Sequence, residues 1–443
     1  MLMKVFIKNY GCSANINDGE IMQGLLSESG RLVVDSVEES DAIVLNTCTV
    51  KGKVESEIKR EIKRIQTEFP SKKLVIAGCM PQVQSGMLHE LAPESALIGP
   101  HQIDEIVGAF ENKNAFVRID KKAQVKANLP KLRKNPLVNI VQINEGCVGS
   151  CTFCITKLAK PKLLSFPMAQ IRADIEKGIK DGCKEVWLTS QDTAAYGKEN
   201  RRNLPMLLDE VLSVEGDFMF RIGMMNPDNI IGIEEELVSR IKHPKVFKFI
   251  HIPLQSGSDD ILKRMKREYT VEDFKKIVAK IRKEIPEISI ATDIICGFPG
   301  ETEYQFEETL RLVHEMKFDV INVSRYWERP GTASAKMDGK LNGRITKERS
   351  TRLMQLFREV AKERNDAWIN WEGEILIDEK GTLEATWSGR NYAYKPVIVK
   401  SAENIFGKNL RVKITAATSF DLRGEEITQL QPINEEVLLR ITS

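Results

Sequence analysis

The segment CVGSCTFC places three cysteines close together, at Cys147, Cys151 and Cys154. The apolar, β-branched residues 137–143 before it are typical of a buried strand, so the loop leaves the carboxyl end of that strand. A [4Fe–4S] cluster usually takes four thiolates, and three local cysteines would leave its fourth iron open to a ligand or substrate. The alternative is a zinc site or buried structural thiols, but zinc prefers a fourth protein ligand and no His or Cys follows closely.

Three more cysteines each follow a strand-like segment directly. Cys12 comes after residues 3–8, Cys48 after residues 42–46, and Cys79 after residues 73–77. Ligands of parallel α/β sheets bind where the strands end, so we expect these three side chains to converge on one rim. One such cysteine would usually be a packing residue, but three at equivalent places predict a second cluster, again with three protein ligands and one free iron.

Four regions of different composition must position these cysteines. Residues 1–125 alternate strand-like and helical segments, which predicts a doubly wound parallel sheet. Residues 126–136 form a basic linker that prolines keep irregular. Residues 137–370 contain about six strand–helix repeats, as a partial (β/α)6 TIM-like barrel requires. Residues 371–443 hold short strand-like segments between turns and predict a small β-barrel.

The composition is that of an ordinary globular protein, with 42% hydrophobic and 29% charged residues and a net charge of +2 over 443 residues. This charge excludes a uniformly basic nucleic-acid-binding protein, so contacts with a polyanion must come from local clusters. No apolar run reaches membrane-spanning length and the N-terminus lacks a secretory signal, so we expect a cytoplasmic protein without a membrane partner. Eight cysteines in a reducing cytosol indicate metal or redox use.

Several short sequence motifs occur within these regions. They are YGC at 10–12, NTCTV at 46–50, EGC at 145–147, LTSQDT at 188–193, HIPLQSGS at 251–258, TDIICGFPGET at 292–302 and RPGT at 329–332. Together they resemble the radical S-adenosylmethionine (SAM) methylthiotransferases over essentially the whole chain. The resemblance implies an N-terminal methylthiotransferase domain, a radical SAM core and a TRAM-like RNA-binding barrel.

The resemblance also implies the cofactors, which are two [4Fe–4S] clusters and SAM. The cluster on Cys147, Cys151 and Cys154 would reduce SAM to methionine and a deoxyadenosyl radical, and the cluster on the other three cysteines would carry the sulfur. A second SAM would methylate that sulfur, so SAM is both radical source and methyl donor. The clusters carry the chemistry, because radical reactions belong to the cofactor while the protein positions it. We therefore expect no single catalytic side chain.

The resemblance places eight residues near SAM or the substrate: Phe153, Gln191, Asp192, Gln255, Ser256, Ile295, Cys296 and Gly297. Phe153 and the strand 295–297 would lie on the adenine side of SAM, and Gln191 and Asp192 would approach its polar groups. Asp192 could instead be a turn residue, and we favour a buried packing role for Cys296. Cys183 is interpreted as structural, and His251 is at least as consistent with a rim position as with a catalytic base.

Three branches of this family act on different substrates: isopentenyladenosine in tRNA, an aspartate of a ribosomal protein, and N6-threonylcarbamoyladenosine in tRNA. The segments TKLA at 156–159, WLTS at 187–190 and MKREY at 265–269 look most like the archaeal and eukaryotic members of the third branch. That branch converts the nucleoside at tRNA position 37, next to the anticodon, to its 2-methylthio derivative. Its members usually carry Arg-Gly where this chain has Lys160-Pro161, and lysine keeps the charge but not the bidentate fork.

The implied partners are tRNA, a sulfur donor and a low-potential electron donor such as ferredoxin or flavodoxin, and we expect a monomer. Two groups of residues suit RNA: the basic cluster Lys263, Arg264, Lys266 and Arg267 on a helix, and seven basic and aromatic residues of the last region, namely Arg390, Tyr392, Tyr394, Lys395, Arg411, Lys413 and Arg423. A non-catalytic iron–sulfur or RNA-binding protein is the alternative of another class. It predicts clusters without SAM cleavage.

Overall fold

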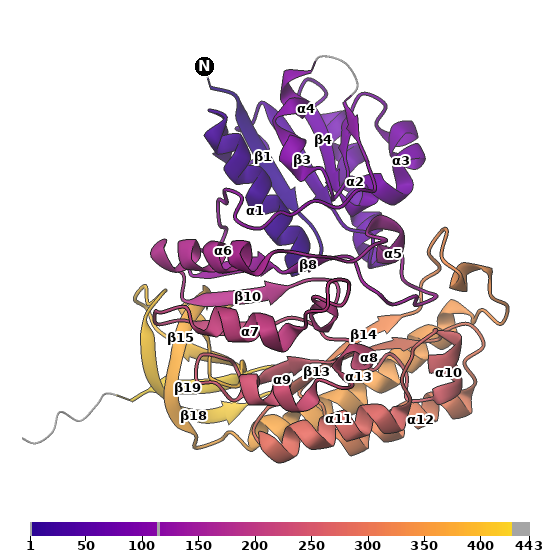
Figure 1. Ribbon diagram of the computed structural model, residues 1–443, viewed down its shortest axis with the longest axis vertical. Helices are drawn as coiled ribbons and strands as arrows, with labels where there is room; N and C mark the ends of the chain where they lie inside the picture. The colour runs from indigo at the N-terminus through magenta and orange to yellow at the C-terminus, as the bar shows by residue number, and fades with distance from the viewer. Residues whose placement is uncertain (1, 113–115, 428–443) are drawn as a thin grey trace, which may run out of the picture.

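A six-stranded parallel sheet forms the N-terminal part of the molecule, at the top of Figure 1. The computed structural model describes residues 2–112 and 116–427. The strand order is β2-β1-β3-β4-β5-β6. The elements are β1 (Lys4–Asn9), α1 (Ser13–Glu28), β2 (Leu32–Val34), β3 (Ala42–Thr47), α2 (Gly52–Glu68), β4 (Lys73–Gly78), α3 (Cys79–Leu91), β5 (Ala96–Ile98), α4 (Gly108–Glu111) and β6 (Val117–Arg118).

Helices cover both faces of this sheet, which confirms the doubly wound prediction. Successive residues of the buried strand β3 point to opposite faces. Val44 packs with Ile21 and Met22 of α1, whereas Ile43 packs on the other face with Ile58 of α2. Both faces of the sheet are therefore closed to water, and the polar rim at the strand ends is left for ligands.

The middle of the chain forms six parallel strands in an open half-barrel. They are β7 (Val138–Gln142), β10 (Glu185–Thr189), β11 (Met219–Ile222), β12 (Phe249–His251), β13 (Ser289–Cys296) and β14 (Val320–Arg325), in two three-stranded sheets with the orders β11-β10-β7 and β12-β13-β14. The helices are α5 (Thr156–Ala159), α6 (Met168–Lys180), α7 (Leu204–Leu212), α8 (Pro227–Ile230), α9 (Glu234–Ile241), α10 (Asp259–Arg264), α11 (Val271–Glu284), α12 (Glu303–Met316) and α13 (Gly343–Asp366). A short pair, β8 (Asn144–Glu145) and β9 (Leu164–Ser165), flanks the cysteine loop.

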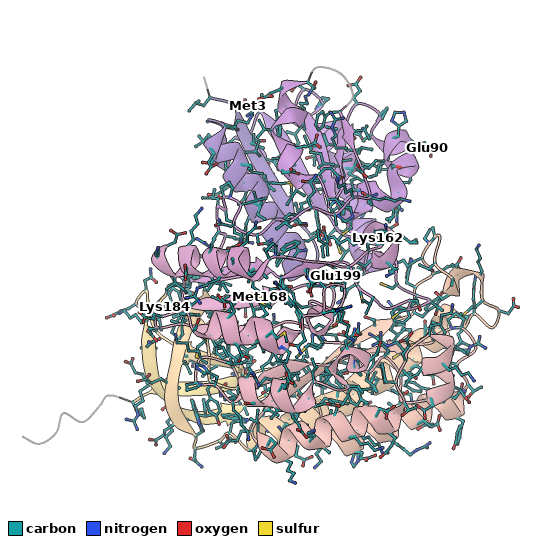
Figure 2. All side chains as sticks on the ribbon, in the orientation of Figure 1. Met3, Glu90, Lys162, Met168, Lys184 and Glu199 are labelled. Carbon is teal, nitrogen blue, oxygen red and sulfur yellow. The ribbon has the colours of Figure 1, made fainter. Side chains whose placement is uncertain are left out.

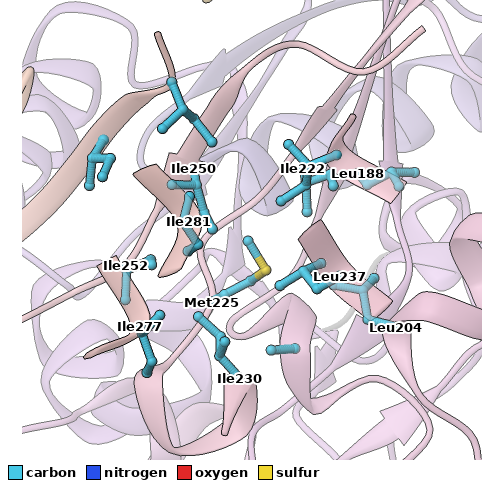
Figure 3. Packing of buried hydrophobic residues seen from close by; sticks show 14 of the residues in the cluster. Leu188, Leu204, Ile222, Met225, Ile230, Leu237, Ile250, Ile252, Ile277 and Ile281 are labelled. Carbon is cyan, nitrogen blue, oxygen red and sulfur yellow. The ribbon is translucent and has the colours of Figure 1, made fainter. Parts of the chain in front are cut away.

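One apolar core fills this half-barrel and confirms the partial TIM-like prediction (Figure 3). Ile222, Ile250 and Leu188 from three strands meet Leu237 and Ile277 from the covering helices, all buried. The closing helix α13 begins at Gly343, because the side chain of Asn342 accepts the backbone N–H of Arg344 and caps the helix.

The last region is a closed barrel of the order β15-β16-β17-β19-β18. Its strands are β15 (Glu372–Lys380), β16 (Thr386–Arg390), β17 (Pro396–Lys400), β18 (Asn409–Ala417) and β19 (Leu422–Glu426). Residues 428–443 of the predicted domain, with the end of its last expected strand, lie outside the described residues. None of the helices in the described ranges has the length and apolar character needed to cross a bilayer.

Several residues expected to face RNA instead dock this barrel on the half-barrel. Arg221 of β11 lies within 5.3 Å of the ring centroids of Trp187, Phe249 and Tyr394. Lys395 is buried, and its Nζ lies 2.8 Å from Asp319 Oδ1. The expectation that Tyr394 and Lys395 contact RNA is therefore wrong, because the barrel uses them to bury the ends of β11, β12 and β14.

A buried carboxyl at this junction predicts a pH-dependent stability. Glu185 is fully buried, accepts a hydrogen bond from Trp187 Nε1 at 2.8 Å, and has its pKa raised to about 7 by burial and by Asp378. Because the folded pKa lies above the unfolded value near 4.5, the contribution of Glu185 to stability is fully present below pH 4.5 and is lost as the pH rises through 7. We expect Glu185→Gln to stabilise the protein by up to about 3 kcal/mol at pH 8 and by almost nothing at pH 4.

Thermal unfolding at the two pH values measures this difference, with Glu215→Gln as the control because Glu215 is exposed. Equal gains in stability at pH 4 and pH 8 would show that ionisation of Glu185 is not the cause.

Candidate active site

The cysteine loop between β8 and α5 brings the thiols of Cys147 and Cys151 to the two sides of Gly149. A Cβ added to Gly149 would lie 3.5 Å from Cys147 Sγ and 3.8 Å from Cys151 Sγ, so the loop closes around a residue without a side chain. Burial and the neighbouring Asp192 raise the pKa of Cys147 to about 12, and burial and Cys151 raise the pKa of Cys154. Thiols with raised pKa values lose their protons when a bound positive charge stabilises the thiolates, and the irons of a cluster supply that charge.

The donor set of the loop fits an iron–sulfur cluster. Thiolates are the usual ligands of such clusters, and a cube binds each thiolate on a different iron. Cys147, Cys151 and Cys154 would supply three of these ligands and leave the fourth iron open.

Arg267 contacts this loop, a position that the sequence did not predict. Its Nη1 lies 3.0 Å from Cys151 Sγ and its Nη2 donates to Asn226 Oδ1 at 2.6 Å. The expectation that Arg267 joins an exposed basic cluster is wrong. The helix ends at Arg264, and Lys266 adopts a left-handed φ of 54°, so the chain turns and Arg267 points inward. Its buried neighbours Met265 and Tyr269 are the signal that separates it from a solvated residue.

Asp192 lies behind the same loop and is completely buried. Its Oδ2 accepts hydrogen bonds from Asn226 Nδ2 at 2.8 Å and Asn229 Nδ2 at 2.5 Å, and Cys147 Sγ is 3.9 Å away. Its Oδ1 accepts from the backbone N–H of Ala194 and of Asn226. The carboxylate is thus fully engaged within the protein, and Asp192 holds the strand end that faces the cysteine loop.

A cleft of about 730 Å³ opens beside the loop, between the half-barrel and the N-terminal sheet. Phe153, Cys154, Gln255 and Ile295 line one side. Gln255 carries a left-handed φ of 69°, a strained conformation that clusters at functional sites. Residues 50–53 and Arg60, which follow Cys48 in the chain, line the other side.

The remaining predicted residues lie near the cleft without lining it. Ser256 and Cys296 are fully buried, and Cys296 belongs to the apolar core. Gln191 is half-buried, and its Oε1 accepts the backbone N–H of Gly146 at 2.8 Å. Gly297 has a φ of +78°, and a Cβ there would come within 2.2 Å of Thr346, so glycine is required at this position.

The second group of cysteines meets at the carboxyl ends of the adjacent strands β1, β3 and β4. Cys12 precedes α1, Cys48 follows β3, and Cys79 begins α3. Gly11 approaches Cys48 so closely that a Cβ would lie 2.8 Å from its Sγ. Asn15 ties the group together, because its Nδ2 donates to Thr47 O at 2.8 Å and its Oδ1 lies 3.6 Å from Cys79 Sγ.

The electrostatics of this second group resemble those of the first. Burial raises the pKa of Cys48 and of Cys79, and Lys160 is the largest influence opposing the rise at Cys79. Arg329 of the RPGT motif lines the cleft, and its charge likewise opposes the rise in the pKa of Cys48. Each group of thiols therefore adjoins one wall of the cleft, because Cys154 lines it directly and residues 50–53 follow Cys48 in the chain. Cys48 and Cys79 are buried, Cys12 is exposed, and the three cysteines of the loop are half-buried.

Comparison with known proteins agrees with this architecture. Residues 4–99 match the Uncharacterized protein family UPF0004, residues 141–313 the Radical SAM superfamily, and residues 372–427 the TRAM domain. The radical SAM methyltransferase TsrM from Kitasatospora setae has a similar fold, with a TM-score of 0.56 at 14% identity over 75% of this chain and 77% of that one. The fold and the cysteine groups thus define a radical SAM protein with a TRAM domain.

Relatives with higher identity narrow the class. A threonylcarbamoyladenosine tRNA methylthiotransferase of Xenopus laevis is 39% identical over 436 residues, which is 96% of this chain and 77% of the relative. A probable threonylcarbamoyladenosine tRNA methylthiotransferase of Pyrococcus horikoshii is also 39% identical, over 96% of this chain and all of the relative. The chain belongs to the threonylcarbamoyladenosine tRNA methylthiotransferase family.

Proposed function

We propose that this protein attaches a methylthio group to carbon C2 of N6-threonylcarbamoyladenosine at position 37 of tRNA. The observation that carries the proposal is a cleft of about 730 Å³ whose walls come from the two cysteine-bearing domains. A reaction that joins a substrate carbon to a cluster-bound sulfur requires both groups of thiols to face one substrate. The division at residues 1–125, 126–136, 137–370 and 371–443 describes this arrangement, with the cleft between the first and third parts.

Each domain would hold one cluster. Cys147, Cys151 and Cys154 would bind the first, beside which SAM would sit against Phe153, Gln255 and Ile295. Cys12, Cys48 and Cys79 would bind the second cluster. When bound, the clusters and SAM supply the electron, the radical and the sulfur that an unactivated purine carbon needs. The chain's own residues orient these groups, and Arg267 and Asp192 position the strand ends and the loop from behind.

Nucleoside mass spectrometry tests the function directly. Reconstituted protein is incubated with SAM, sulfide, reductant and tRNA that carries N6-threonylcarbamoyladenosine. A methylthio group on that nucleoside is the expected product. Deoxyadenosine without modified nucleoside would keep the radical SAM assignment and redirect the search to isopentenyladenosine or a ribosomal protein aspartate. Clusters without deoxyadenosine would favour a non-catalytic protein.

The partners follow from the same reaction. A sulfur donor must replace the transferred sulfur, and a low-potential donor such as ferredoxin or flavodoxin must deliver electrons. The cleft is built from one chain, which is consistent with a monomer. Free thiols and a tRNA substrate favour the cytoplasm.

Basic residues at the mouth of the cleft are expected to contact the phosphates of the anticodon arm. Lys51, Lys53 and Arg60 are exposed and line it, and the acidic Asp293 is engaged by His251 Nε2 at 3.1 Å and by Asn322. We expect Lys53→Glu to weaken tRNA binding and to lower the slope of log K against log salt by about 1.

Filter binding at several salt concentrations measures this slope. Lys63→Glu is the matched control, because Lys63 is exposed on the same helix α2 but does not line the cleft. Equal slopes for the Lys53 and Lys63 variants would place the RNA elsewhere.

A further inference from the structure

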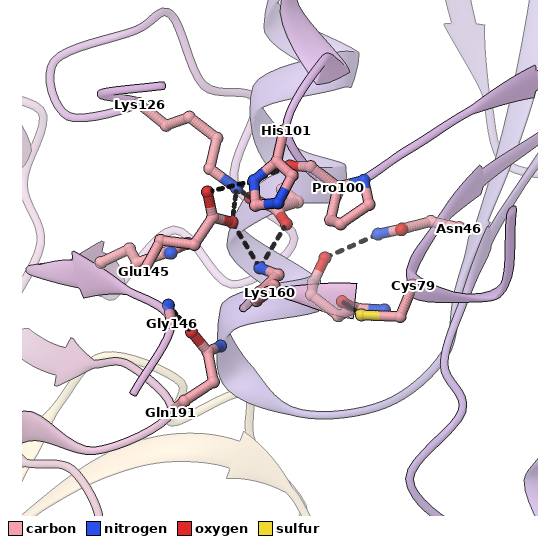
Figure 4. Close-up of polar contacts among 12 residues, drawn as sticks. Asn46, Cys79, Pro100, His101, Lys126, Glu145, Gly146, Lys160 and Gln191 are labelled. Carbon is pink, nitrogen blue, oxygen red and sulfur yellow. Dashed lines mark hydrogen bonds and ion pairs between the residues drawn. The ribbon is translucent and has the colours of Figure 1, made fainter. Parts of the chain in front are cut away.

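A cluster of buried charges lies where the N-terminal sheet meets the half-barrel (Figure 4). It contains two lysines, two carboxylates and one histidine, each at most 2% exposed: Asp18, His101, Lys126, Glu145 and Lys160. Charges are rarely buried so deeply unless they are paired, and removing one partner leaves the other without compensation. The members of this cluster therefore depend on one another.

The two lysines share the same two carboxylates. Lys126 Nζ lies 2.7 Å from Asp18 Oδ1 and 2.9 Å from Glu145 Oε1. Lys160 Nζ lies 2.7 Å from Glu145 Oε1 and 3.7 Å from Asp18 Oδ2. His101 Nδ1 contacts the other oxygen of Glu145 at 2.8 Å. Each lysine thus joins a carboxylate of the N-terminal domain to a carboxylate of the half-barrel.

The position of Lys160 differs from that of Lys126 in one respect. Lys126 has a third partner in the N-terminal domain, because its Nζ also donates to Pro100 O at 3.0 Å. Lys160 directly follows α5, the helix that comes after Cys154, and α5 packs against α3, which begins at Cys79. Lys160 therefore stands between the two cysteine groups (Figure 4).

We propose that Lys160 is a positioning residue for the second cluster: its buried ammonium joins the two cluster-bearing domains and places a fixed positive charge beside Cys79. This inference rests on the proposed second cluster. Reduction adds an electron to a cluster, and a nearby cation in a poorly hydrated site stabilises the added negative charge. Loss of Lys160 then makes the second cluster harder to reduce.

The test compares Lys160→Met, Lys160→Arg, Lys126→Met and Lys162→Met in the full-length, reconstituted protein. Lys162 is exposed near the same junction and serves as the control (Figure 2). The readout is the midpoint potential of the second cluster in an electron paramagnetic resonance titration. A full-length variant with Cys147, Cys151 and Cys154 replaced by alanine assigns the signal.

At the wild-type midpoint we expect Lys160→Met to lower the ratio of reduced to oxidised cluster about tenfold, equivalent to about 59 mV for one electron. Lys160→Arg and Lys162→Met should keep the wild-type ratio, and Lys126→Met should shift it less than Lys160→Met. A merely structural role predicts equal effects of the two buried-lysine variants, so equal shifts or an unchanged ratio in Lys160→Met would overturn the proposal.

Two further results remain informative. If Lys160→Met fails to fold, a wild-type potential in Lys160→Arg supports the role of the charge, and a lowered potential in Lys160→Arg contradicts it. If the wild-type protein itself binds only one cluster, the proposed function fails at its second cluster, and the inference about Lys160 fails with it. A wild type with two clusters and an insensitive Lys160→Met variant overturns the inference alone.

Discussion

Replacement of Cys48 by alanine is expected to abolish methylthio transfer while deoxyadenosine formation continues. Replacement of Cys147 is expected to abolish both. The two cysteines belong to separate thiol groups: residues 50–53, which follow Cys48, line one wall of the cleft, whereas Phe153 and Cys154 of the loop that begins at Cys147 line the other, on the proposed SAM side. Loss of a direct ligand should exceed the roughly 10–100-fold cost of losing a supporting group.

Iron content, deoxyadenosine release and nucleoside mass spectrometry, measured on the same preparations, separate the two outcomes. Cys183→Ala is the matched control. Cys183 is also buried, but its thiol donates to Pro136 O at 3.3 Å, outside both groups. Loss of deoxyadenosine formation in the Cys48 variant, with the first cluster still loaded, would contradict the division of roles between the two groups.

The second large effect is expected at Arg267. Its guanidinium contacts Cys151 Sγ, Asn226 and the ring of Tyr269 at the same time, and lysine cannot reproduce this fork. We expect both Arg267→Met and Arg267→Lys to lower cluster retention and deoxyadenosine formation by roughly 10–100-fold, the range for groups that orient metal ligands. Arg267→Met should also lower stability, because it leaves a buried polar network without its cation.

Iron per chain and the rate of deoxyadenosine formation check this prediction. Lys266→Met serves as the control, since Lys266 is the exposed neighbour on the same turn. Full cluster content and activity in Arg267→Lys would show that the charge suffices and that the hydrogen-bond geometry at Cys151 does not matter.

Most of the fold could be predicted from local patterns. The strand-like segment 42–46 corresponds to β3 (Ala42–Thr47), whose residues are all buried, as expected of a central parallel strand. Helix ends were harder to place, because they depend on single side chains such as the cap at Asn342. The TRAM-like barrel was foreseen, but its docking through Arg221 and Tyr394 was not.

The candidate site also has features that the sequence predicted and features that it did not. The spacing of the cysteines and their places after strands were local features, and they predicted two convergent groups. Arg267 and Lys126 looked like surface and linker charges, because basic residues are usually solvated. Arg267 pairs with Asn226, 41 residues away, and Lys126 pairs with Asp18, 108 residues away, and such distant pairs leave no periodic signal in one sequence.

The sequence by itself therefore determined the order of the domains, the class of chemistry and the identity of the six candidate cluster ligands. These properties follow from strand and helix periodicity and from thiol spacing, which are written in neighbouring residues. Only the tertiary structure decided which charges are buried and how the two cysteine groups meet at one cleft. Folding brings α1, the cysteine loop and α5 together at the junction, and the high cost of an unpaired buried charge then selects Lys160, Glu145, Asp18 and Lys126 as mutual partners.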